Sequence, residues 1–316
     1  KDFVIDPKFA DHPIFKERVF GTNFGFLSKR GYYGRDDVLI QPKLMRDMGI
    51  NWVTLNMNVC QGNYFSTKQY IDFEYTAGEL ELYEISRALK DQGIKILFKP
   101  CLTLMDGQWM GSVAFPSVGC QIEGVSVDYW KKWFDSFSKC VRYFSALSEK
   151  LSFDGLIIGA EYFGTEGRSE DWNRMIGIAR EYYGGPITYE FTPASRKQNK
   201  LEWFSALDFL SYSYYPPACP QSFIDNPEDV PNYTKDEMKE YLSSRRSKIF
   251  EISKTYYNKP IVFTEFGVRS SHGSIVLPFN FQFSGKYDGQ EQANYLQAAY
   301  EVFEDLSVWL GFFWWK

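Results

Sequence analysis

The stretch Ile261-Val262-Phe263-Thr264-Glu265-Phe266-Gly267 is a short apolar run that carries one carboxylate near its end. Leu156-Ile157-Ile158-Gly159-Ala160-Glu161 has the same form and ends in a glutamate. Runs this short, rich in β-branched and aromatic residues, indicate buried strands. We therefore predict that both are strands of one parallel sheet, with Glu161 and Glu265 at their carboxyl ends.

Similar runs recur along the chain and alternate with longer amphipathic segments, which is typical of a sheet built from βα units. The predicted strands are Val19 to Phe26, Trp52 to Asn58, Ile94 to Leu104, Leu156 to Glu161, Pro186 to Thr192, Phe209 to Tyr215, Pro260 to Gly267 and Val308 to Trp315. The predicted helices are Pro42 to Met48, Glu79 to Lys90, Val127 to Ser148, Glu170 to Tyr183, Leu201 to Ala206, Thr234 to Tyr257 and Gln290 to Asp305.

Eight strands with intervening helices favour an α/β fold with a closed (β/α)8 TIM barrel, formed as one domain over residues 1–316. The first strand is not followed by a GxGxxG turn, which argues against an open doubly wound sheet. Two long segments, Cys60 to Tyr75 and Asp106 to Ser126, are predicted substrate loops. The last helix of a complete barrel is lacking after Trp315, so the chain is either shortened there or covered by residues 1 to 18.

Composition narrows the class of ligand. Of the residues, 44% are apolar and 24% charged, and no apolar run approaches the roughly 18 residues of a membrane span. The net charge of −5 argues against nucleic acid, because affinity for phosphates comes mostly from Lys and Arg. An aromatic content of 19% suits a protein that stacks on sugar rings. We expect a soluble protein without membrane or nucleic-acid partners. The cytoplasmic or secreted location and the oligomeric state stay open, since the chain begins with Lys and shows no signal segment.

Cysteines and histidines give little support for a metal or redox site. The five cysteines lie far apart without a CxxC pair, at Cys60, Cys101, Cys120, Cys140 and Cys219. Only His12 and His272 are present, so a His-rich metal site or a Ser-His-Asp triad has little support. We predict reduced buried thiols, two surface imidazoles, no metal and no cofactor.

The two glutamates suit glycosidic cleavage. The carboxyl ends of barrel strands converge on one cavity, so Glu161 and Glu265 should face each other. One carboxyl group must donate a proton to the leaving oxygen while the other, ionised, attacks the anomeric carbon, and a separation of about 5 Å gives retention. Alternatively, each glutamate only caps a helix or forms a salt bridge. Glu190 and Asp106 are rival carboxylates.

Aromatic side chains at the strand ends complete the predicted site. Tyr214 is predicted to donate a hydrogen bond to Glu265 and so to favour its ionised form. One of Trp314 and Trp315 must point into the barrel and could floor a sugar subsite, because adjacent strand residues point to opposite faces. Trp109 is a second candidate platform. Core packing is the alternative for each of these side chains.

At these residues the sequence resembles clan A glycosidases, and most of all glycoside hydrolase family 113, a family of β-mannanases. The resemblance spans nearly the whole chain, from Gly21 to Lys316. Its most specific pieces are Asn51-Trp52-Val53, Phe98-Lys99-Pro100, Asp106-Gly107-Gln108-Trp109, Gly184-Gly185-Pro186-Ile187-Thr188-Tyr189, Phe263-Thr264-Glu265-Phe266-Gly267-Val268-Arg269-Ser270 and Trp314-Trp315-Lys316.

The resemblance implies a (β/α)-barrel that hydrolyses β-mannosidic bonds with retention and without a catalytic metal. It assigns the acid/base to Glu161 and the nucleophile to Glu265. The predicted substrate-binding residues are Trp109, Trp314, Trp315, Asn56, Lys99, Cys101 and Met110. Three positions depart from the family pattern: Cys101 replaces a His, Met110 an Arg, and Ala160 a Thr or Asn. We therefore expect a less polar subsite, suited to a sugar with fewer hydroxyls or with an apolar substituent such as an acetyl group.

The predicted function is a retaining glycoside hydrolase acting on β-1,4-mannan or manno-oligosaccharides. Two alternatives stay open. One is a β-glycosidase or transglycosylase on another sugar. The other is a non-catalytic barrel that binds carbohydrate.

Overall fold

The computed structural model describes residues 3–117, 119–195 and 201–315. Two compact units make up the chain: Gly21–Ser211, and Lys1–Phe20 together with Tyr212–Lys316. Lys316, which belongs to the predicted family pattern, lies outside the described residues. The organisation as one domain stays a prediction.

The barrel strands are β1 (Val19–Phe24), β2 (Trp52–Gln61), β4 (Lys95–Leu104), β7 (Gly155–Ala160), β8 (Ile187–Phe191), β9 (Leu210–Ser213), β10 (Ile261–Phe266) and β11 (Trp309–Trp314). Their order in the sheet is β1-β11-β10-β9-β8-β7-β4-β2, and β1 also pairs with β2. The eight parallel strands thus close into a barrel, which confirms the predicted TIM-barrel fold. Each predicted strand is present, and none of its ends is shifted by more than three residues.

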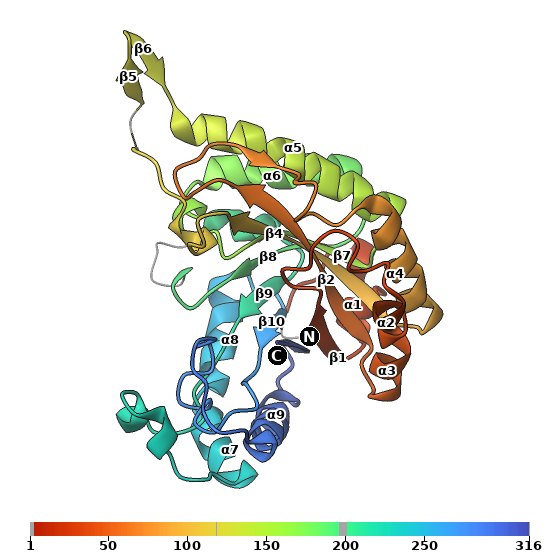
Figure 1. Cartoon of the computed structure of the whole chain (residues 1–316), viewed down its shortest axis with the longest axis vertical. Helices are drawn as coiled ribbons and strands as arrows, with labels where there is room; N and C mark the ends of the chain where they lie inside the picture. The colour runs from red at the N-terminus through yellow and green to blue at the C-terminus, as the bar shows by residue number, and fades with distance from the viewer. Residues whose placement is uncertain (1–2, 118, 196–200, 316) are drawn as a thin grey trace. The chain divides into compact units, whose positions relative to one another are not determined.

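In the unit Gly21–Ser211, helices alternate with the strands (Figure 1). All ten residues of β2 are buried, as expected for a parallel strand covered on both sides. The elements between the strands are α2 (Asp36–Leu39), α3 (Gln41–Asp47), α4 (Glu79–Asp91), η2 (Met110–Ser112), α5 (Tyr129–Lys150), η3 (Phe163–Thr165), α6 (Ser169–Tyr182) and η5 (Glu202–Ala206). Asp128 starts α5 by accepting a hydrogen bond from the Lys131 N–H at 2.9 Å.

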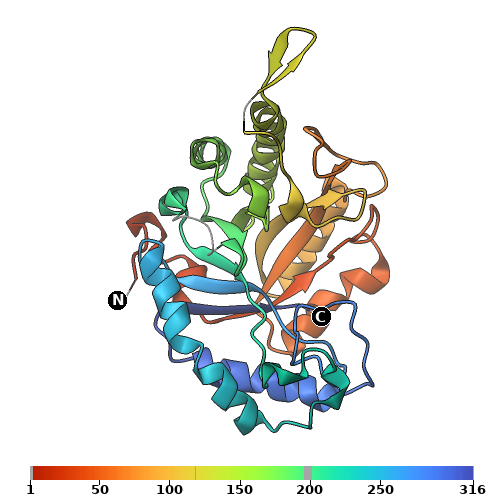
Figure 2. The same cartoon turned by 90° about the vertical axis from the view of Figure 1, so that its left-hand side faces the viewer.

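The two predicted loops contain more regular structure than expected. β2 continues through Cys60 and Gln61, which pair with β3 (Gln69–Tyr70), so the first loop begins later than predicted. The second loop contains η2 and an antiparallel hairpin of β5 (Cys120–Ile122) and β6 (Val125–Val127). Figures 1 and 2 both show this hairpin standing out beyond the start of α5. The hairpin also takes Val127, which was predicted to begin the helix.

In the other unit, the elements outside the barrel strands are η1 (Pro7–Phe9), α1 (Pro13–Lys16), η6 (Gln221–Phe223), η7 (Pro227–Asp229), α7 (Lys235–Ser243), α8 (Arg246–Thr255) and α9 (Gly289–Phe303). In Figure 2, α7 and α9 lie alongside each other. The single helix predicted from Thr234 to Tyr257 is wrong, because α7 ends at Ser243. The hydroxyls of Ser243 and Ser244 donate to the carbonyls of Lys239 and Tyr241, a competition with the backbone that favours a break.

The outer face of β11 is covered without a following helix. The guanidinium of Arg18 lies 5.0 Å from the centre of the Trp309 ring and donates to the carbonyls of Trp309 and Glu304. Trp309 also packs against Phe303 of α9. Residues just before β1, together with α9, therefore bury this strand. Among the described helices, none combines the length and apolarity of a membrane span.

Gly311 on β11 is a position where only glycine fits. Its φ is +133°, and a Cβ there would overlap the carbonyl oxygen of Val19 on β1. We expect Gly311→Ala to lower the free energy of unfolding by about 1–3 kcal/mol, which lowers Tm by several degrees. As a control, Gly177→Ala on α6 meets nothing within 4 Å and should leave Tm equal or higher. A Gly311→Ala variant with the wild-type Tm would contradict this account.

Candidate active site

Glu161 is placed directly after β7 by an unusual backbone conformation. Its φ is +60°, a left-handed value that non-glycine residues adopt only when the surroundings impose it. The Glu161 N–H donates to the Glu190 carbonyl at 2.8 Å, and its own carbonyl accepts from the Phe163 N–H at 2.8 Å. The chain therefore bends out of the strand direction at Glu161, whose side chain is half-buried.

Trp109 holds the Glu161 carboxylate directly. The indole Nε1–H donates to Oε2 of Glu161 at 2.8 Å. The indole stacks on the Phe163 ring, with centroids 6.1 Å apart and an angle of 23° between the planes. Trp109 is 42% exposed, so part of its side chain is accessible to a ligand. The Glu161 contact was not foreseen, since 52 residues separate the two.

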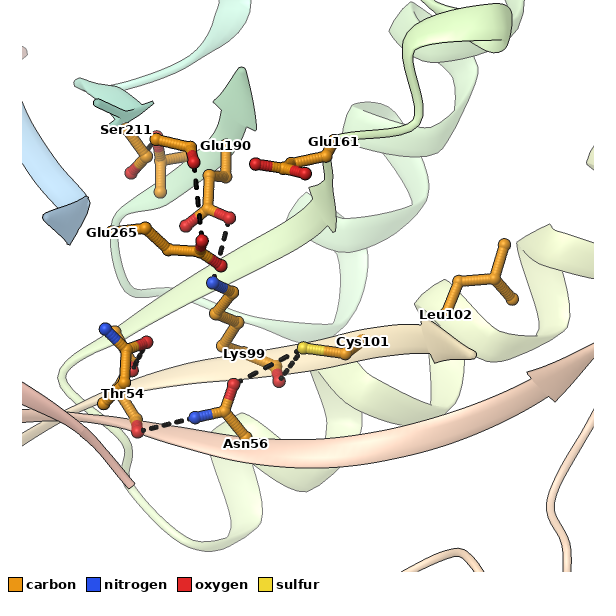
Figure 3. A network of polar contacts seen from close by, with 12 residues as sticks. Thr54, Asn56, Lys99, Cys101, Leu102, Glu161, Glu190, Ser211 and Glu265 are labelled. Carbon is orange, nitrogen blue, oxygen red and sulfur yellow. Dashed lines mark hydrogen bonds and ion pairs between the residues drawn. The ribbon is translucent and has the colours of Figure 1, made fainter. Parts of the chain in front are cut away.

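Lys99, a predicted substrate-binding residue, forms a buried ion pair. Its Nζ lies 2.9 Å from Oε1 of Glu190, and the two side chains are 1% and 0% exposed. Figure 3 shows the Lys99 side chain extending from its strand towards Glu190. Removing one partner of such a pair typically costs about 3–5 kcal/mol, because the other charge stays buried. The structure thus gives both residues a role in the barrel interior and weakens Glu190 as a rival catalytic carboxylate.

Asn56 and Cys101, also predicted to bind substrate, contact each other. The Cys101 thiol donates to Oδ1 of Asn56 at 3.4 Å, and Asn56 Nδ2 donates to the carbonyls of Phe24 and Thr54 (Figure 3). Asn56 is 0% and Cys101 3% exposed. Both polar groups therefore satisfy each other inside the protein.

The other departures differ in exposure. Ala160 is buried, whereas Met110 in η2 is half-buried beside Trp109. Of the three departures, Met110 is the one with substantial access to a ligand at the surface. The less polar subsite stays a prediction that depends chiefly on this residue.

In the other unit, two hydroxyls converge on Glu265, which is half-buried on β10. Tyr215 Oη donates to Oε2 at 3.0 Å and Ser213 Oγ to the same oxygen at 3.4 Å. Tyr215 was not foreseen as a partner of Glu265, and the bond predicted for its neighbour Tyr214 stays a prediction. The Tyr214 ring stacks on Tyr212 at 4.8 Å, and its N–H donates to the Glu265 carbonyl at 2.8 Å.

The two tryptophans near the end of the chain, Trp314 and Trp315, have different neighbours. Trp314 meets Phe266 edge to face at 5.9 Å, and Phe266 stacks on Tyr295 of α9 at 5.4 Å. Trp314 thus lies with the residues that pack against α9. Trp315 stays the candidate for an inward platform, and its N–H donates to the Phe266 carbonyl at 2.8 Å.

Asp106 and the cysteine thiols make contacts that are typical of structural residues. Asp106 is exposed, and its carboxylate accepts from the Gln108 N–H at 3.1 Å, as in a turn. Cys60, Cys101 and Cys219 are buried free thiols, as predicted, whereas Cys120 and Cys140 are half-buried.

The histidines are not plain surface imidazoles. His12 caps α1, with Nδ1 accepting from the Ile14 N–H. His272 lies 3.4 Å from Asp288 and 3.3 Å from Glu291, a set of ligand types that suits a cation. Each of these two acids is already engaged, because Asp288 caps α9 and Glu291 accepts from the N–H groups of Gly273 and Ile275.

Glu166, which the sequence did not single out, is buried five residues after Glu161. Its carboxylate accepts from Ser195 Oγ at 2.8 Å and Tyr189 Oη at 2.9 Å. Burial raises the pKa of Glu166 to about 7, although the two hydroxyls act in the opposite direction, and the charge of Glu161 adds a small increase. Glu166 thus titrates near neutral pH beside the segment that carries Glu161.

The pKa of Glu166 gives a pH-dependent stability. Since the folded value of about 7 lies above the ordinary 4.5, the native state binds this proton more tightly than the unfolded chain. The free energy of unfolding should therefore fall as pH rises from about 4.5 to about 7, by up to about 3 kcal/mol. Glu166→Gln removes this contribution, so its Tm relative to wild type should rise between pH 5 and pH 7.5. Exposed Glu170→Gln is the control, and a Tm difference for Glu166→Gln that is constant with pH would contradict the argument.

The chain matches the family model of glycoside hydrolase family 113 over residues 22–316. No curated protein sequence matches it. A solved structure described as a family 113 β-1,4-mannanase shares 25% identity with a TM-score of 0.79, covering 95% of this chain and 88% of that one. For the β-mannanase AaManA from Alicyclobacillus acidocaldarius in complex with ManMIm, the identity is 22% and the TM-score 0.80, with coverage of 95% and 87%.

A more distant structure, the endo-1,4-β-D-mannanase from Thermotoga petrophila, shares 13% identity at a TM-score of 0.57, with coverage of 94% and 88%. At this identity the likeness shows the barrel fold alone. The family model, by contrast, extends over nearly all of the chain, including the segments that carry Trp109, Glu161 and Glu265. The chain therefore belongs to glycoside hydrolase family 113.

Proposed function

We propose that this glycoside hydrolase cleaves β-1,4-linked mannan or manno-oligosaccharides with retention of configuration, using Glu161 as acid/base and Glu265 as nucleophile. The observation that carries the proposal is the position of the two glutamates. Glu161 directly follows β7, the fourth strand of the barrel, and Glu265 is the second-to-last residue of β10, the seventh strand. In barrel enzymes the catalytic residues come from the carboxyl ends of different strands.

The different hydrogen-bond partners of the two carboxylates support this division of roles. Two hydroxyls donate to one oxygen of Glu265, and such donors stabilise the charged form that a nucleophile needs. The Trp109 indole N–H donates to Oε2 of Glu161. These unlike contacts support the assignment of Glu161 as acid/base and of Glu265 as nucleophile.

The proposed reaction has two displacements at the anomeric carbon. In the first, a carboxylate oxygen of Glu265 attacks that carbon while Glu161 transfers its proton to the departing glycosidic oxygen. In the second, Glu161 removes a proton from water, and the resulting hydroxide attacks the same carbon and releases Glu265. Two inversions give net retention, and both glutamates return to their starting protonation states.

The choice of mannan is supported by the solved structures of the family, which are described as β-1,4-mannanases. A β-glycosidase or transglycosylase acting on another sugar is the alternative that Met110 and Cys101 keep open. A non-catalytic carbohydrate-binding barrel is the other. Release of reducing ends from β-mannan, β-glucan, xylan and chitin oligosaccharides separates them. Mannan alone should be cleaved at a substantial rate, whereas faster cleavage of another sugar or no cleavage would overturn the proposal.

The two carboxylates should differ in how their loss depends on the leaving group. Glu265→Ala should abolish turnover of every substrate. Glu161→Ala should lose about 10²–10⁴-fold in kcat/KM on mannooligosaccharides, yet keep a kcat/KM near wild type on a 2,4-dinitrophenyl β-mannoside, because that leaving group needs no proton in the first displacement. Its kcat on the activated substrate should fall, because the second displacement uses Glu161 as base. Steady-state kinetics on both substrates measures the difference.

Asp106→Asn is the matched control, because it removes the charge of a rival carboxylate and keeps its hydrogen-bond acceptor. This variant should retain activity on both substrates. Equal losses of Glu161→Ala on the natural and the activated substrate would exclude Glu161 as the general acid.

A further inference from the structure

Two glycines allow close packing around Trp109, one within the loop that follows β4 and one between this loop and the segment that carries Glu161. At Gly111 a Cβ would overlap the Trp109 indole, so the absence of a side chain lets the ring lie flat over this residue. At Gly164 in η3 a Cβ would overlap the Val113 carbonyl oxygen, so η3 and this loop are in close contact. Phe163 stacks on the Trp109 ring. The position of Trp109 is thus set by packing that involves both segments.

The chemistry of the indole decides how the Glu161 carboxyl group can carry a proton. An indole nitrogen only donates, so Oε2 of Glu161 must accept in the bond at 2.8 Å. In a protonated carboxyl group the carbonyl-type oxygen is the better acceptor, which leaves the hydroxyl on the other oxygen. The Trp109 bond therefore selects Oε1 as the oxygen that holds the proton. It also favours the ionised form, because it donates to the charged oxygen.

We infer that Trp109 is a positioning residue that fixes which oxygen of Glu161 donates the proton and tunes the pH at which the acid is lost. This inference rests on the proposed function. It differs from a platform role, because a platform acts through the ring face and changes substrate affinity. The positioning role acts through the single N–H group and changes the pH dependence.

The test is the pH profile of kcat/KM on a mannooligosaccharide, where activity falls on the alkaline side as the general acid ionises. Trp109→Phe keeps an aromatic ring and removes the N–H. Without the donor the ionised form loses stabilisation, so the alkaline limb should move to higher pH by roughly half a unit to one unit. On a 2,4-dinitrophenyl β-mannoside, which needs no general acid, kcat/KM should lack this limb in both proteins.

Two further variants make the result specific. Gly111→Ala leaves Trp109 intact but displaces its ring, and it should move the limb in the same direction. Trp130→Phe removes another indole N–H, one that donates to the Phe115 carbonyl at 3.1 Å, and it should leave the limb in place. A limb that stays fixed in both Trp109→Phe and Gly111→Ala while KM rises would overturn the positioning role in favour of a platform.

The failure of this inference is distinguishable from that of the proposed function. If Glu161→Gln retains activity and the alkaline limb, the limb does not belong to Glu161 and the proposed roles are wrong. If Glu161→Gln loses activity on the mannooligosaccharide but Trp109→Phe leaves the limb unmoved, only the role of Trp109 is wrong.

Discussion

A charge inside this barrel must have a partner, and this constraint shapes the whole site. The strands are buried on both faces, so an ionic side chain along them would lose its hydration without compensation. Lys99 and Glu190 meet the requirement by pairing at 2.9 Å. Glu161 and Glu265 meet it differently, because they stand at strand ends where they are half-buried and hydrogen-bonded. The two proposed catalytic carboxylates thus stand at the carboxyl ends of their strands.

The same constraint explains why the barrel could be predicted from the sequence. A strand without charged residues in its interior appears in the sequence as a short apolar run. In these strands the one carboxylate stands at the end of the run. Leu156 to Glu161 and Ile261 to Gly267 show this form, and both correspond to observed strands, β7 and β10. The long apolar-periodic segment after Thr234 was misleading, because two consecutive serines break it by binding backbone carbonyls.

The details of the candidate site were less accessible, since they depend on contacts between distant segments. No spacing rule connects Trp109 with Glu161, or Ser195 with Glu166. The bond from Tyr215 to Glu265 was not foreseen either. The family resemblance placed Cys101 among the predicted substrate-binding residues, and it could not show that the thiol donates to the buried Asn56. Sequence patterns predicted the strands and the carboxylates, but not the partners that tune them.

The account treats the two glutamates as a pair with unlike surroundings, one held by an indole and the other by two hydroxyls. Its central claim is that they perform a double displacement. Proton NMR of the newly formed reducing end, recorded in the first minutes of hydrolysis before mutarotation, tests this claim most directly. The account predicts that the β-anomer appears first and that the α-anomer grows in later. An α-anomer formed at the outset would show inversion and would contradict Glu265 as a covalent nucleophile.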